Sequence, residues 1–250
     1  MIQSVDRAIR ILNVLKGARL VSLKEIAGRL DLPASTTHGI IKTLVAHGMV
    51  EQESDSGRYK LGPAVLLLGN VYLDTLELRT RSIRWAEEVA KRTGYAVRVG
   101  VLLSEDVVII HHEPRPDGTR QMPEVGIVIP AHASALGKAI LARRSSDADR
   151  LLGRTLNNMT GETIVDPDEF RKELATVRVT GIANERDEAV LGESGQGAPI
   201  LGPTGEVIGA IEMVFTSGEW PIDEAATVAL RESARNISRE LGAPPFPPET

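Results

Sequence analysis

The chain has 250 residues, of which 42% are hydrophobic, and a formal net charge of −5, so it has enough apolar material for one large or two ordinary globular domains. It contains no cysteine, which excludes a disulfide scaffold and a thiolate metal site, and its first ten residues lack the apolar core of a secretory signal. No apolar run approaches the ~20 residues of a membrane helix, so we expect a cytoplasmic protein without a membrane segment.

The charges are distributed unevenly along the chain. Residues 1–62 contain 9 of the 29 Lys and Arg residues and 6 of the 34 Asp and Glu residues, which gives this segment a charge near +3 and the remainder a charge near −8. A basic segment attached to an acidic body is typical of a small module that binds a polyanion.

Three short helices are predicted before residue 48. Apolar residues recur at helical spacing from Val5 to Leu15, with Ser4 as the expected N-cap. The segment Ser22 to Glu25 has the pattern of a capping box and predicts a second helix of about two turns. Ser35 is expected to cap a third helix, which ends at Gly48.

A β-hairpin is predicted directly after these helices. Residues 49–61 form two alternating strands around the turn-forming sequence Ser-Asp-Ser-Gly at 54–57. A helix, a helix-turn-helix and a hairpin in this order are the parts of a winged helix. We therefore expect residues 1–62 to form a winged helix-turn-helix DNA-binding domain.

The start of the third helix carries short polar side chains. In a helix-turn-helix the second of the two helices enters the major groove, and its first residues contact bases and phosphates. The candidate DNA contacts on this helix and the hairpin are Ser35, Thr36, Thr37, His38, Lys42, Arg58 and Lys60. The alternative is structural, in which Ser35 is only a cap, Thr37 is half buried and the lysines are solvated.

A linker helix and a mixed domain are predicted for the rest of the chain. The leucine-rich helix at 63–78 is expected to pack against a partner chain. Beyond it we expect strands at 96–103, 107–112, 121–127, 189–192, 197–201 and 207–215, and helices at 80–92, 134–142, 146–152, 167–177 and 223–241. This mixture predicts an α+β domain, one sheet flanked by helices, over residues 79–242. Residues 243–250 are expected to be a disordered tail.

Several separated segments resemble one known family. Residues 4–62, 132–142 (HASALGKAILA), 181–188 (GIANERDE) and 198–215 (APILGPTGEVIGAIEMVF) resemble the IclR-type transcriptional regulators. Residues 68–94 and 108–126 are most similar to the glycerol-operon repressors of actinomycetes within that family. The resemblance implies a GAF-like α/β effector-binding domain, dimers or dimers of dimers, and a small ligand that changes the affinity for a palindromic operator in double-stranded DNA.

The resemblance also implies an effector site. By position, its residues are Ala135, Leu136, Glu185, Gly195, Glu212 and Val214. Relatives that bind small keto acids have hydroxyl groups on the strand that matches 208–215, and these are missing here. Carboxylates accept hydrogen bonds from hydroxyl groups and repel anions, so the two glutamates favour glycerol or a similar neutral polyol. Glycerol 3-phosphate would need a cation such as Arg98, or the backbone N–H groups at the Ser134 helix start.

The function that follows is repression of a catabolic operon for glycerol or a related polyol. One alternative is an IclR-type regulator, repressor or activator, of small organic acid or aromatic catabolism. The rival class is an enzyme or metabolite-binding protein without a DNA role. We predict no enzyme, because no nucleophile, base and orienting group is evident in the sequence.

Two further patterns were considered as sites. His111 and His112 are adjacent on a predicted strand and point to opposite faces, so they cannot bind one metal ion together. His132 with one of them is an alternative zinc site, because some relatives bind zinc, but we predict no metal or cofactor. Residues 192–199 (GESGQGAP) match neither a P-loop nor a nucleophile elbow, so an ordinary loop is expected.

Overall fold

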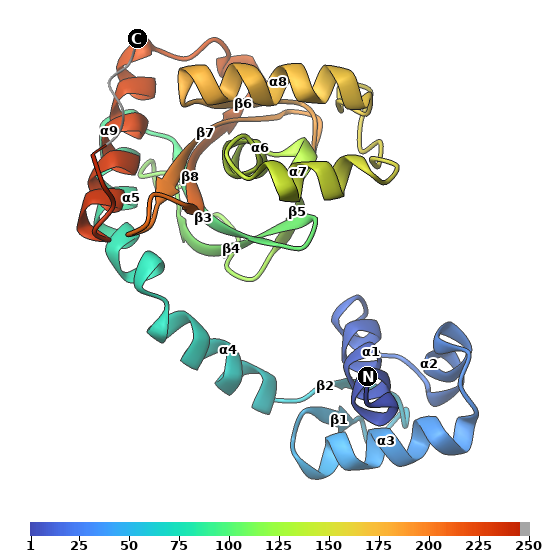
Figure 1. Ribbon diagram of the computed structural model, residues 1–250. Helices are drawn as coiled ribbons and strands as arrows, with labels where there is room; N and C mark the ends of the chain where they lie inside the picture. Colours follow the sequence, from blue (N-terminus) through green and yellow to red (C-terminus); the bar gives the residue numbers. More distant parts are fainter. Residues whose placement is uncertain (246–250) are drawn as a thin grey trace. The chain divides into compact units, whose positions relative to one another are not determined.

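The computed structural model describes residues 1–245 of the chain (Figure 1). They divide into two compact units, one of residues 1–75 and one from residue 76 on, and each unit is described by itself. Of the predicted tail at 243–250, residues 246–250 lie outside the described residues. No helix within residues 1–245 is long and apolar enough to cross a membrane.

The first unit contains three helices, a hairpin and a further helix. Its elements are α1 (Gln3–Lys16), α2 (Leu23–Leu30), α3 (Ala34–Ala46), β1 (Val50–Gln52), β2 (Tyr59–Leu61) and α4 (Ala64–Thr75). The two strands are antiparallel, and a bridge between Val21 and Tyr59 ties the hairpin to the segment before α2. Buried apolar side chains from all three helices and the hairpin, among them Ile11, Ile26 and Ile41, form one core. The predicted winged helix-turn-helix fold is confirmed.

Of the three N-caps predicted in the first unit, only the one at α2 is present. The Ser22 hydroxyl accepts a hydrogen bond from the Glu25 N–H, and the Glu25 carboxylate accepts one from the Ser22 N–H, so the capping box is confirmed. The predicted caps Ser4 and Ser35 are wrong, because α1 begins one residue before Ser4 and α3 begins directly after Pro33. The proline ring fixes φ near −57°, a value a helix start accepts, and the helix begins two residues earlier than a cap at Ser35 would place it.

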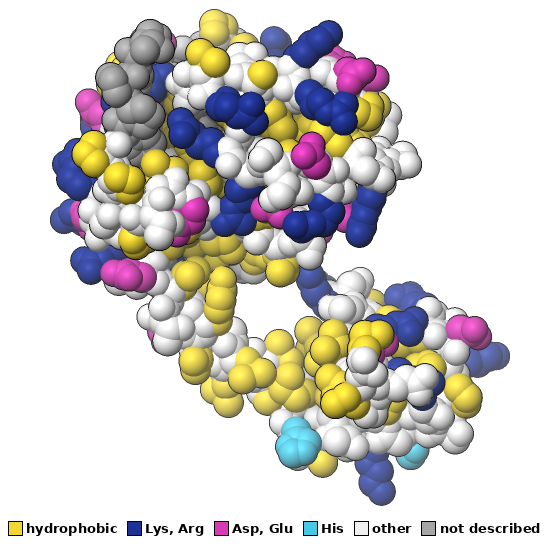
Figure 2. Space-filling model, in the orientation of Figure 1, with side chains coloured by type: hydrophobic (Ala, Val, Ile, Leu, Met, Phe, Trp, Pro, Cys, Tyr) yellow, Lys and Arg dark blue, Asp and Glu magenta, His cyan; other side chains and the backbone are white. Residues whose placement is uncertain are grey.

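Helix α4 exposes its apolar side chains. It contains no buried residue, and its exposed apolar side chains are Leu66, Leu67, Leu68, Val71 and Tyr72. Figure 2 shows them as a nearly continuous apolar surface along the helix. The helix predicted at 63–78 ends at Thr75, and the next helix begins at Glu77.

The second unit is a six-stranded antiparallel sheet between two layers of helices (Figure 1). The strand order is β5-β4-β3-β8-β7-β6, with β3 (Ala96–Leu103), β4 (Asp106–Glu113), β5 (Val128–Pro130), β6 (Ala183–Arg186), β7 (Glu193–Leu201) and β8 (Val207–Thr216). One face carries α5 (Glu77–Thr93) and α9 (Glu224–Glu240), and the other α6 (Ala135–Leu141), α7 (Ser145–Leu152) and α8 (Pro167–Thr180). The predicted α+β architecture, one sheet flanked by helices, is confirmed.

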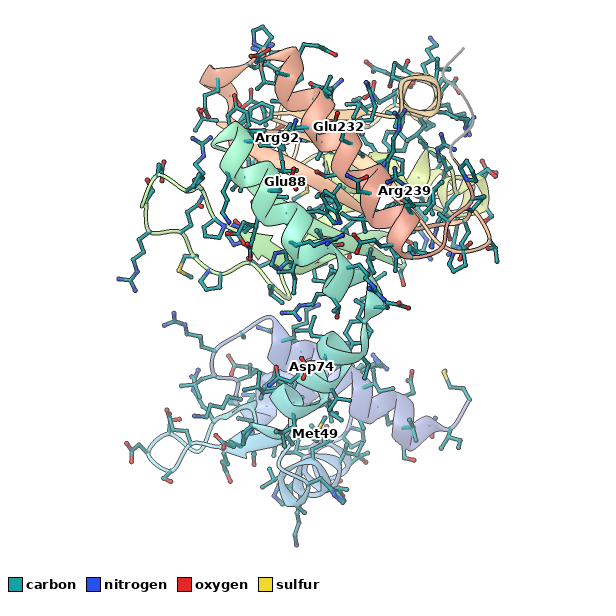
Figure 3. All side chains as sticks on the ribbon, turned by 90° about the vertical axis from the view of Figure 1, so that its left-hand side faces the viewer. Met49, Asp74, Glu88, Arg92, Glu232 and Arg239 are labelled. Atoms are coloured by element: carbon teal, nitrogen blue, oxygen red, sulfur yellow. The ribbon has the colours of Figure 1, made fainter. Side chains whose placement is uncertain are left out.

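Helices α5 and α9 lie side by side on the sheet (Figure 3). The guanidinium of Arg92 on α5 lies 3.1 Å from a carboxylate oxygen of Glu232 on α9 and 3.6 Å from one of Glu88 on its own helix. These pairs are about half exposed, so they contribute little, and the buried apolar faces of the two helices supply most of the stability.

Helix α6 is buried on all sides, and two glycines allow it to lie there. Every residue of α6 is buried. A Cβ atom at Gly137 would lie 2.0 Å from the Ala131 carbonyl oxygen, and one at Gly197 on β7 would lie 2.5 Å from that of Ala135. The helix start is thus held directly against strand β7 of the sheet.

Three local predictions in the second unit are wrong. Residues 121–127 belong to an irregular segment in which Gly126 has a φ of +88°, so the strand begins only at Val128. Residues 189–192 form the turn between β6 and β7, which ends at Gly192 with a φ of +87°. Of residues 192–199, expected to be a loop, 193–199 are the first part of β7, which is buried between α6 and α9 and needs small residues there.

Candidate functional site

The polar start of α3 is divided between surface and core. Ser35 and His38 are exposed and Thr36 is partly exposed, whereas Thr37 is 0% exposed. The Thr37 hydroxyl donates a hydrogen bond to the Pro33 carbonyl oxygen at 3.1 Å. Thr37 therefore cannot contact DNA, and its assignment as a DNA-contacting residue is wrong.

The basic candidates of the first unit are exposed. Lys42 lies one turn after His38 on α3, so the two side chains share a face of the helix. On the hairpin, Arg58 is exposed, and the Lys60 ammonium lies 3.4 Å from a Glu51 carboxylate oxygen with both side chains 46% exposed. An ion pair this exposed is weak, so Lys60 can exchange Glu51 for a phosphate at little cost.

In the second unit, the sheet register brings the predicted effector residues together. Paired residues on neighbouring strands form rows across β6, β7, β8 and β3, in that order. One row is Glu185, Gly195, Val214 and Ala96. The next row is Ala183, Gly197, Glu212 and Arg98. Residues two apart on a strand share a face, so both rows lie on the face that α6 covers.

The start of α6 closes over these rows. The Leu136 N–H donates a hydrogen bond to a Glu212 carboxylate oxygen at 2.9 Å, and the Gly137 N–H donates one to the Ser134 hydroxyl at 3.1 Å. A Cβ atom at Gly195 would lie 3.7 Å from both the Ala135 Cβ and a Glu185 carboxylate oxygen. All six predicted effector residues therefore surround one region, and two of the helix-start N–H groups considered for a phosphate are already bonded.

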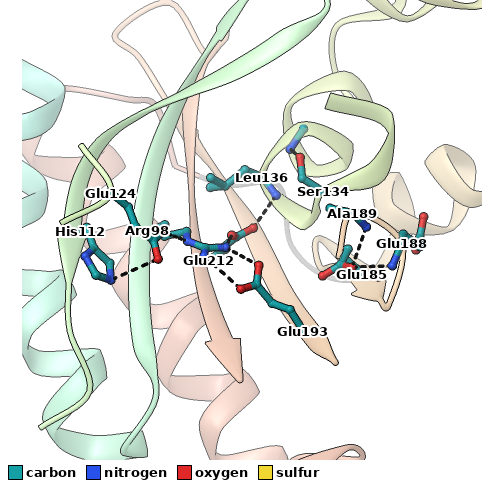
Figure 4. Close-up of polar contacts among 11 residues, drawn as sticks. Arg98, His112, Glu124, Ser134, Leu136, Glu185, Glu188, Ala189, Glu193 and Glu212 are labelled. Atoms are coloured by element: carbon teal, nitrogen blue, oxygen red, sulfur yellow. Dashed lines mark hydrogen bonds and ion pairs between the residues drawn. The ribbon is translucent and has the colours of Figure 1, made fainter. Parts of the chain in front are cut away.

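Arg98 is the centre of a buried charge cluster (Figure 4). Its Nε pairs with Glu124, its Nη1 and Nη2 lie 2.8 and 3.2 Å from the two Glu193 carboxylate oxygens, and its Nη1 lies 3.3 Å from one of Glu212. Burial alone would lower the pKa of Arg98, but these three carboxylates raise it above its ordinary value. One cation thus holds three carboxylates and is not free to bind a phosphate.

Burial raises the pKa values of two glutamates of the site well above the ordinary value of a carboxyl group. Burial raises the pKa of Glu212 to about 7, although Arg98 opposes this shift. Burial also raises the pKa of Glu185 to about 8, although its carboxylate accepts hydrogen bonds from the N–H groups of Glu188 at 2.8 Å and Ala189 at 3.3 Å. A protonated carboxyl group both donates and accepts hydrogen bonds, as a ligand with several hydroxyl groups requires.

A cavity of about 140 Å³ lies beside the charge cluster. Its walls include strand residues and residues of the segment between β4 and β5: Arg98, Glu193, Val214, Thr216, Gln121 and Glu124. Since a liquid water takes ~30 Å³, the cavity can hold a molecule of a few non-hydrogen atoms.

Of the six predicted effector residues only Val214 lines this cavity, and the sequence did not point to its acidic residues Glu193 and Glu124. Glu193 lies two residues before Gly195 on β7, so the alternation of a strand would have placed it on the same face. Glu124 lies outside the strands and helices, and no sequence pattern links it to Arg98.

The histidines are dispersed in the second unit. The Nε2 atom of His111 lies 3.9 Å from a Glu113 carboxylate oxygen, that of His112 lies 3.9 Å from one of Glu124, and that of His132 lies 2.9 Å from the Asn157 carbonyl oxygen. Over residues 1–245, no group of three His, Asp or Glu side chains is placed to hold a metal ion.

The chain matches two models of one protein family. The family model of the IclR helix-turn-helix domain matches residues 4–54, and that of the bacterial transcriptional regulator IclR C-terminal domain matches residues 70–239. The chain belongs to the IclR family. Members of this family are transcriptional regulators, so the resemblance found in the separate sequence segments is confirmed, and the first unit is the DNA-binding part of an IclR-type regulator.

Individual IclR-family proteins are similar over nearly the whole chain. The glycerol operon regulatory proteins of Streptomyces coelicolor and Streptomyces griseus are 38% and 39% identical, over 98% of this chain and 98% of theirs. The crystal structure of an IclR transcriptional regulator from Alicyclobacillus acidocaldarius has a TM-score of 0.83 and 28% identity, and the match covers 97% of this chain and 100% of that one. The pocket described above lies in the part that matches the IclR C-terminal domain.

Proposed function

We propose that this IclR-family regulator represses an operon for the use of glycerol or a related neutral polyol, and that the polyol releases it from its operator. The observation that carries the proposal is the composition of the pocket, in which Arg98 is already paired with Glu124, Glu193 and Glu212. The similarity to two glycerol operon regulatory proteins supports the same class of effector.

The charges of the pocket favour a neutral ligand over an anion. A keto acid or a phosphate ester would add negative charge beside Glu193, while both arginines that line the cavity, Arg98 and Arg115, are already paired with carboxylates. A polyol brings hydroxyl groups that donate hydrogen bonds to carboxylate oxygens such as those of Glu124 and Glu193, which line the cavity. A ligand with three or four adjacent hydroxyl groups fits both the volume and this chemistry.

For DNA binding, the start of α3 supplies base contacts, and basic side chains of α3 and the hairpin supply phosphate contacts. Ser35, Thr36 and His38 at the accessible start of α3 are the candidates for base edges and nearby phosphates. Lys42, Arg58 and Lys60 are the candidates for phosphates, whose contribution falls steeply with salt.

We further propose that the regulator binds a palindromic operator as a dimer, or as a dimer of dimers. The exposed apolar side chains of α4, among them Leu67 and Val71, supply a surface for a second copy of the chain. Two copies related by a two-fold axis present two α3 helices to two half-sites.

A mobility-shift experiment with the full chain and the DNA upstream of its own gene tests the proposal. We expect binding at low salt that weakens as salt increases, and release of the DNA by glycerol but not by glycerol 3-phosphate or pyruvate. Release by glycerol 3-phosphate alone would contradict the neutral effector. If the chain bound none of this DNA at low salt, the proposal that it represses by binding an operator there would be contradicted.

A further inference from the structure

The segment 114–127, between β4 and β5, forms one wall of the pocket without being a strand or a helix. Met122 at its middle is 81% exposed. Near its end, the Gly126 N–H donates to the Ile109 carbonyl oxygen at 2.8 Å, and the Ile127 N–H donates to that of Glu124 at 2.9 Å. The Glu124 side chain extends from this exposed segment to Arg98 (Figure 4).

Arg98 does not depend on Glu124 for its charge balance. Glu193 and Glu212 pair with the same guanidinium from two strands of the sheet, where their positions are fixed by the ladder. The third carboxylate gives the cluster an excess of negative charge. If Glu124 leaves, Arg98 is still paired and the repulsion among the carboxylates falls.

His112 has a buried nitrogen atom without a partner beside this ion pair. Its side chain is 5% exposed, its Nε2 atom has no hydrogen-bond partner, and the Glu124 carboxylate is 3.9 Å away, beyond hydrogen-bond distance. His112 lies opposite Arg98 in the sheet register, so both side chains belong to the same row. A ligand hydroxyl group closer to this nitrogen than the Glu124 carboxylate is would form a hydrogen bond with it. This bond is favourable because a buried polar atom without a partner costs free energy.

We propose that Glu124 is the gate of the effector pocket: the effector takes its place beside Arg98 and His112, and the segment 114–127 moves away from the pocket. This inference rests on the proposed polyol effector. Arg98 and His112 then join the effector-binding residues, and Glu124 competes with the effector rather than contacting it.

The competition fixes the sign of a substitution at Glu124. When only a fraction of the molecules is open, the apparent affinity for the effector is reduced by that fraction. Glu124→Gln removes the charge of the Glu124 side chain and keeps its shape, so the open fraction rises and glycerol binds more tightly. The gain is up to about 10-fold, because the closed state loses a charged hydrogen bond of ordinary strength. If Glu124 instead held the effector, the same substitution would weaken binding.

The experiment compares four full-length chains: the unaltered protein, Glu124→Gln, His112→Phe and the control Glu105→Gln. Glu105 also pairs with an arginine, Arg154, and does not line the pocket. Amide hydrogen exchange of residues 114–127 is measured with and without glycerol, and glycerol affinity is measured by calorimetry. The release of operator DNA by glycerol is followed with the same preparations.

We expect exchange in 114–127 to be faster in free Glu124→Gln than in the unaltered protein, and glycerol to produce the same increase in the unaltered protein. Glu124→Gln should bind glycerol more tightly, His112→Phe more weakly with unchanged exchange of the free segment, and Glu105→Gln as the unaltered protein does. Unchanged exchange in free Glu124→Gln, or equal or weaker glycerol binding by it, overturns the gate, while release of DNA by glycerol leaves the proposed function intact. A failure of glycerol to bind any of the chains overturns the effector class and the gate with it.

Discussion

The ammonium nitrogen of Lys138 lies 2.5 Å from a carboxylate oxygen of Glu188, and both side chains are buried. Lys138 also donates a hydrogen bond to the Asn184 carbonyl oxygen at 3.0 Å. Because Lys138 is on α6 and Asn184 is on β6, these contacts tie the helix that covers this face of the sheet to the strand that carries Glu185.

Lys138→Met should destabilise the second unit strongly. It leaves the Glu188 carboxyl group buried without its cation, and the removal of one partner of a buried pair costs about 3–5 kcal/mol. The double variant Lys138→Met with Glu188→Gln should recover much of this loss, because no buried charge is left unpaired. Urea unfolding measures the loss in both variants.

As the control, Arg171→Met breaks an exposed pair with Asp168 and should cost less than about 1 kcal/mol. Equal losses in the single and double variants would show that the charge of Glu188 is not the cause.

The stability of the second unit should depend on the protonation of Glu185. Burial raises the pKa of this group from 4.5 to about 8 in the folded chain, so between these values the folded state binds a proton that the unfolded state has lost. The contribution of Glu185 to stability therefore falls as pH rises through this range, by ~1.4 kcal/mol per unit, and is constant above it. Glu185→Gln cannot ionise, so its stability gain over the unaltered chain should grow from about pH 5 to about pH 8 and then level off.

Urea unfolding of both chains at several pH values measures this difference, which removes the contribution of titrating groups that do not interact with Glu185. Gln keeps an oxygen that can accept from the Glu188 and Ala189 N–H groups, so the fold should be retained. A difference that does not change with pH would mean that Glu185 is ionised in the folded chain, and the pocket would then carry more negative charge than proposed.

Two glycines of β7 should respond differently to alanine. A Cβ atom at Gly195 would meet the Met213 carbonyl oxygen at 3.2 Å and a Glu185 carboxylate oxygen at 3.7 Å, so the chain should fold with a modest loss while the methyl group occupies space among the proposed effector residues. At Gly197 the Cβ atom would lie 2.5 Å from the Ala135 carbonyl oxygen, which is backbone and cannot rotate away. Gly197→Ala should therefore cost about 1–3 kcal/mol or more.

Urea unfolding and glycerol calorimetry separate the two effects. Gly195→Ala should weaken glycerol binding with little change in unfolding, and Gly197→Ala should shift unfolding itself. Unchanged glycerol affinity in Gly195→Ala would place the effector away from this part of the sheet.

The sequence predicted the regular elements well where pattern and position agree. The strands β3 and β8 were predicted within one residue, because buried apolar residues fill them between clear turn residues. The strand β7 was predicted four residues too short, because Gly195 and Gly197 resemble loop residues until α6 is packed on them. Residues 121–127 have apolar character without forming a ladder, so their pattern alone suggested a strand.

The site was predictable only in part. The family resemblance supplied six positions, and the strand register unites them. The ion pair of Arg98 with Glu124 joins residues 26 apart through an irregular segment, and only the folded chain reveals it. At α3, Thr37 lies four residues before Ile41, and this spacing places both on the buried face of the helix. The prediction gave more weight to the hydroxyl group of Thr37, because polar side chains at this helix start are expected to face DNA.

The positions of Thr37 and His38 predict opposite consequences for DNA binding. Thr37→Val removes only the buried hydrogen bond to Pro33, so it should change stability by about 1 kcal/mol and leave the sequence preference for DNA unchanged. His38→Ala removes an exposed side chain at the start of α3, so it should change the preference at one position of each half-site, where a base contact contributes about 1–3 kcal/mol of discrimination. Binding to a panel of half-site variants measures both. A changed preference in Thr37→Val with normal stability would mean that α3 presents a different face to DNA.

Dimerisation through α4 predicts the effect of charge on its apolar surface. Leu67 and Val71 are 67% and 63% exposed and four residues apart, so they lie on one side of the helix. The double variant Leu67→Glu with Val71→Glu would place two carboxylates in an apolar contact, and sedimentation should show monomers where the unaltered chain forms dimers or larger assemblies. Affinity for a palindromic operator should fall because one half-site is lost, while glycerol binding, which belongs to the second unit, should be retained. Asn70→Glu adds a charge to the same exposed helix at a polar position and should leave the assembly intact. If the double variant still forms dimers, the contact between copies lies elsewhere on the chain, and the apolar surface of α4 needs a different partner.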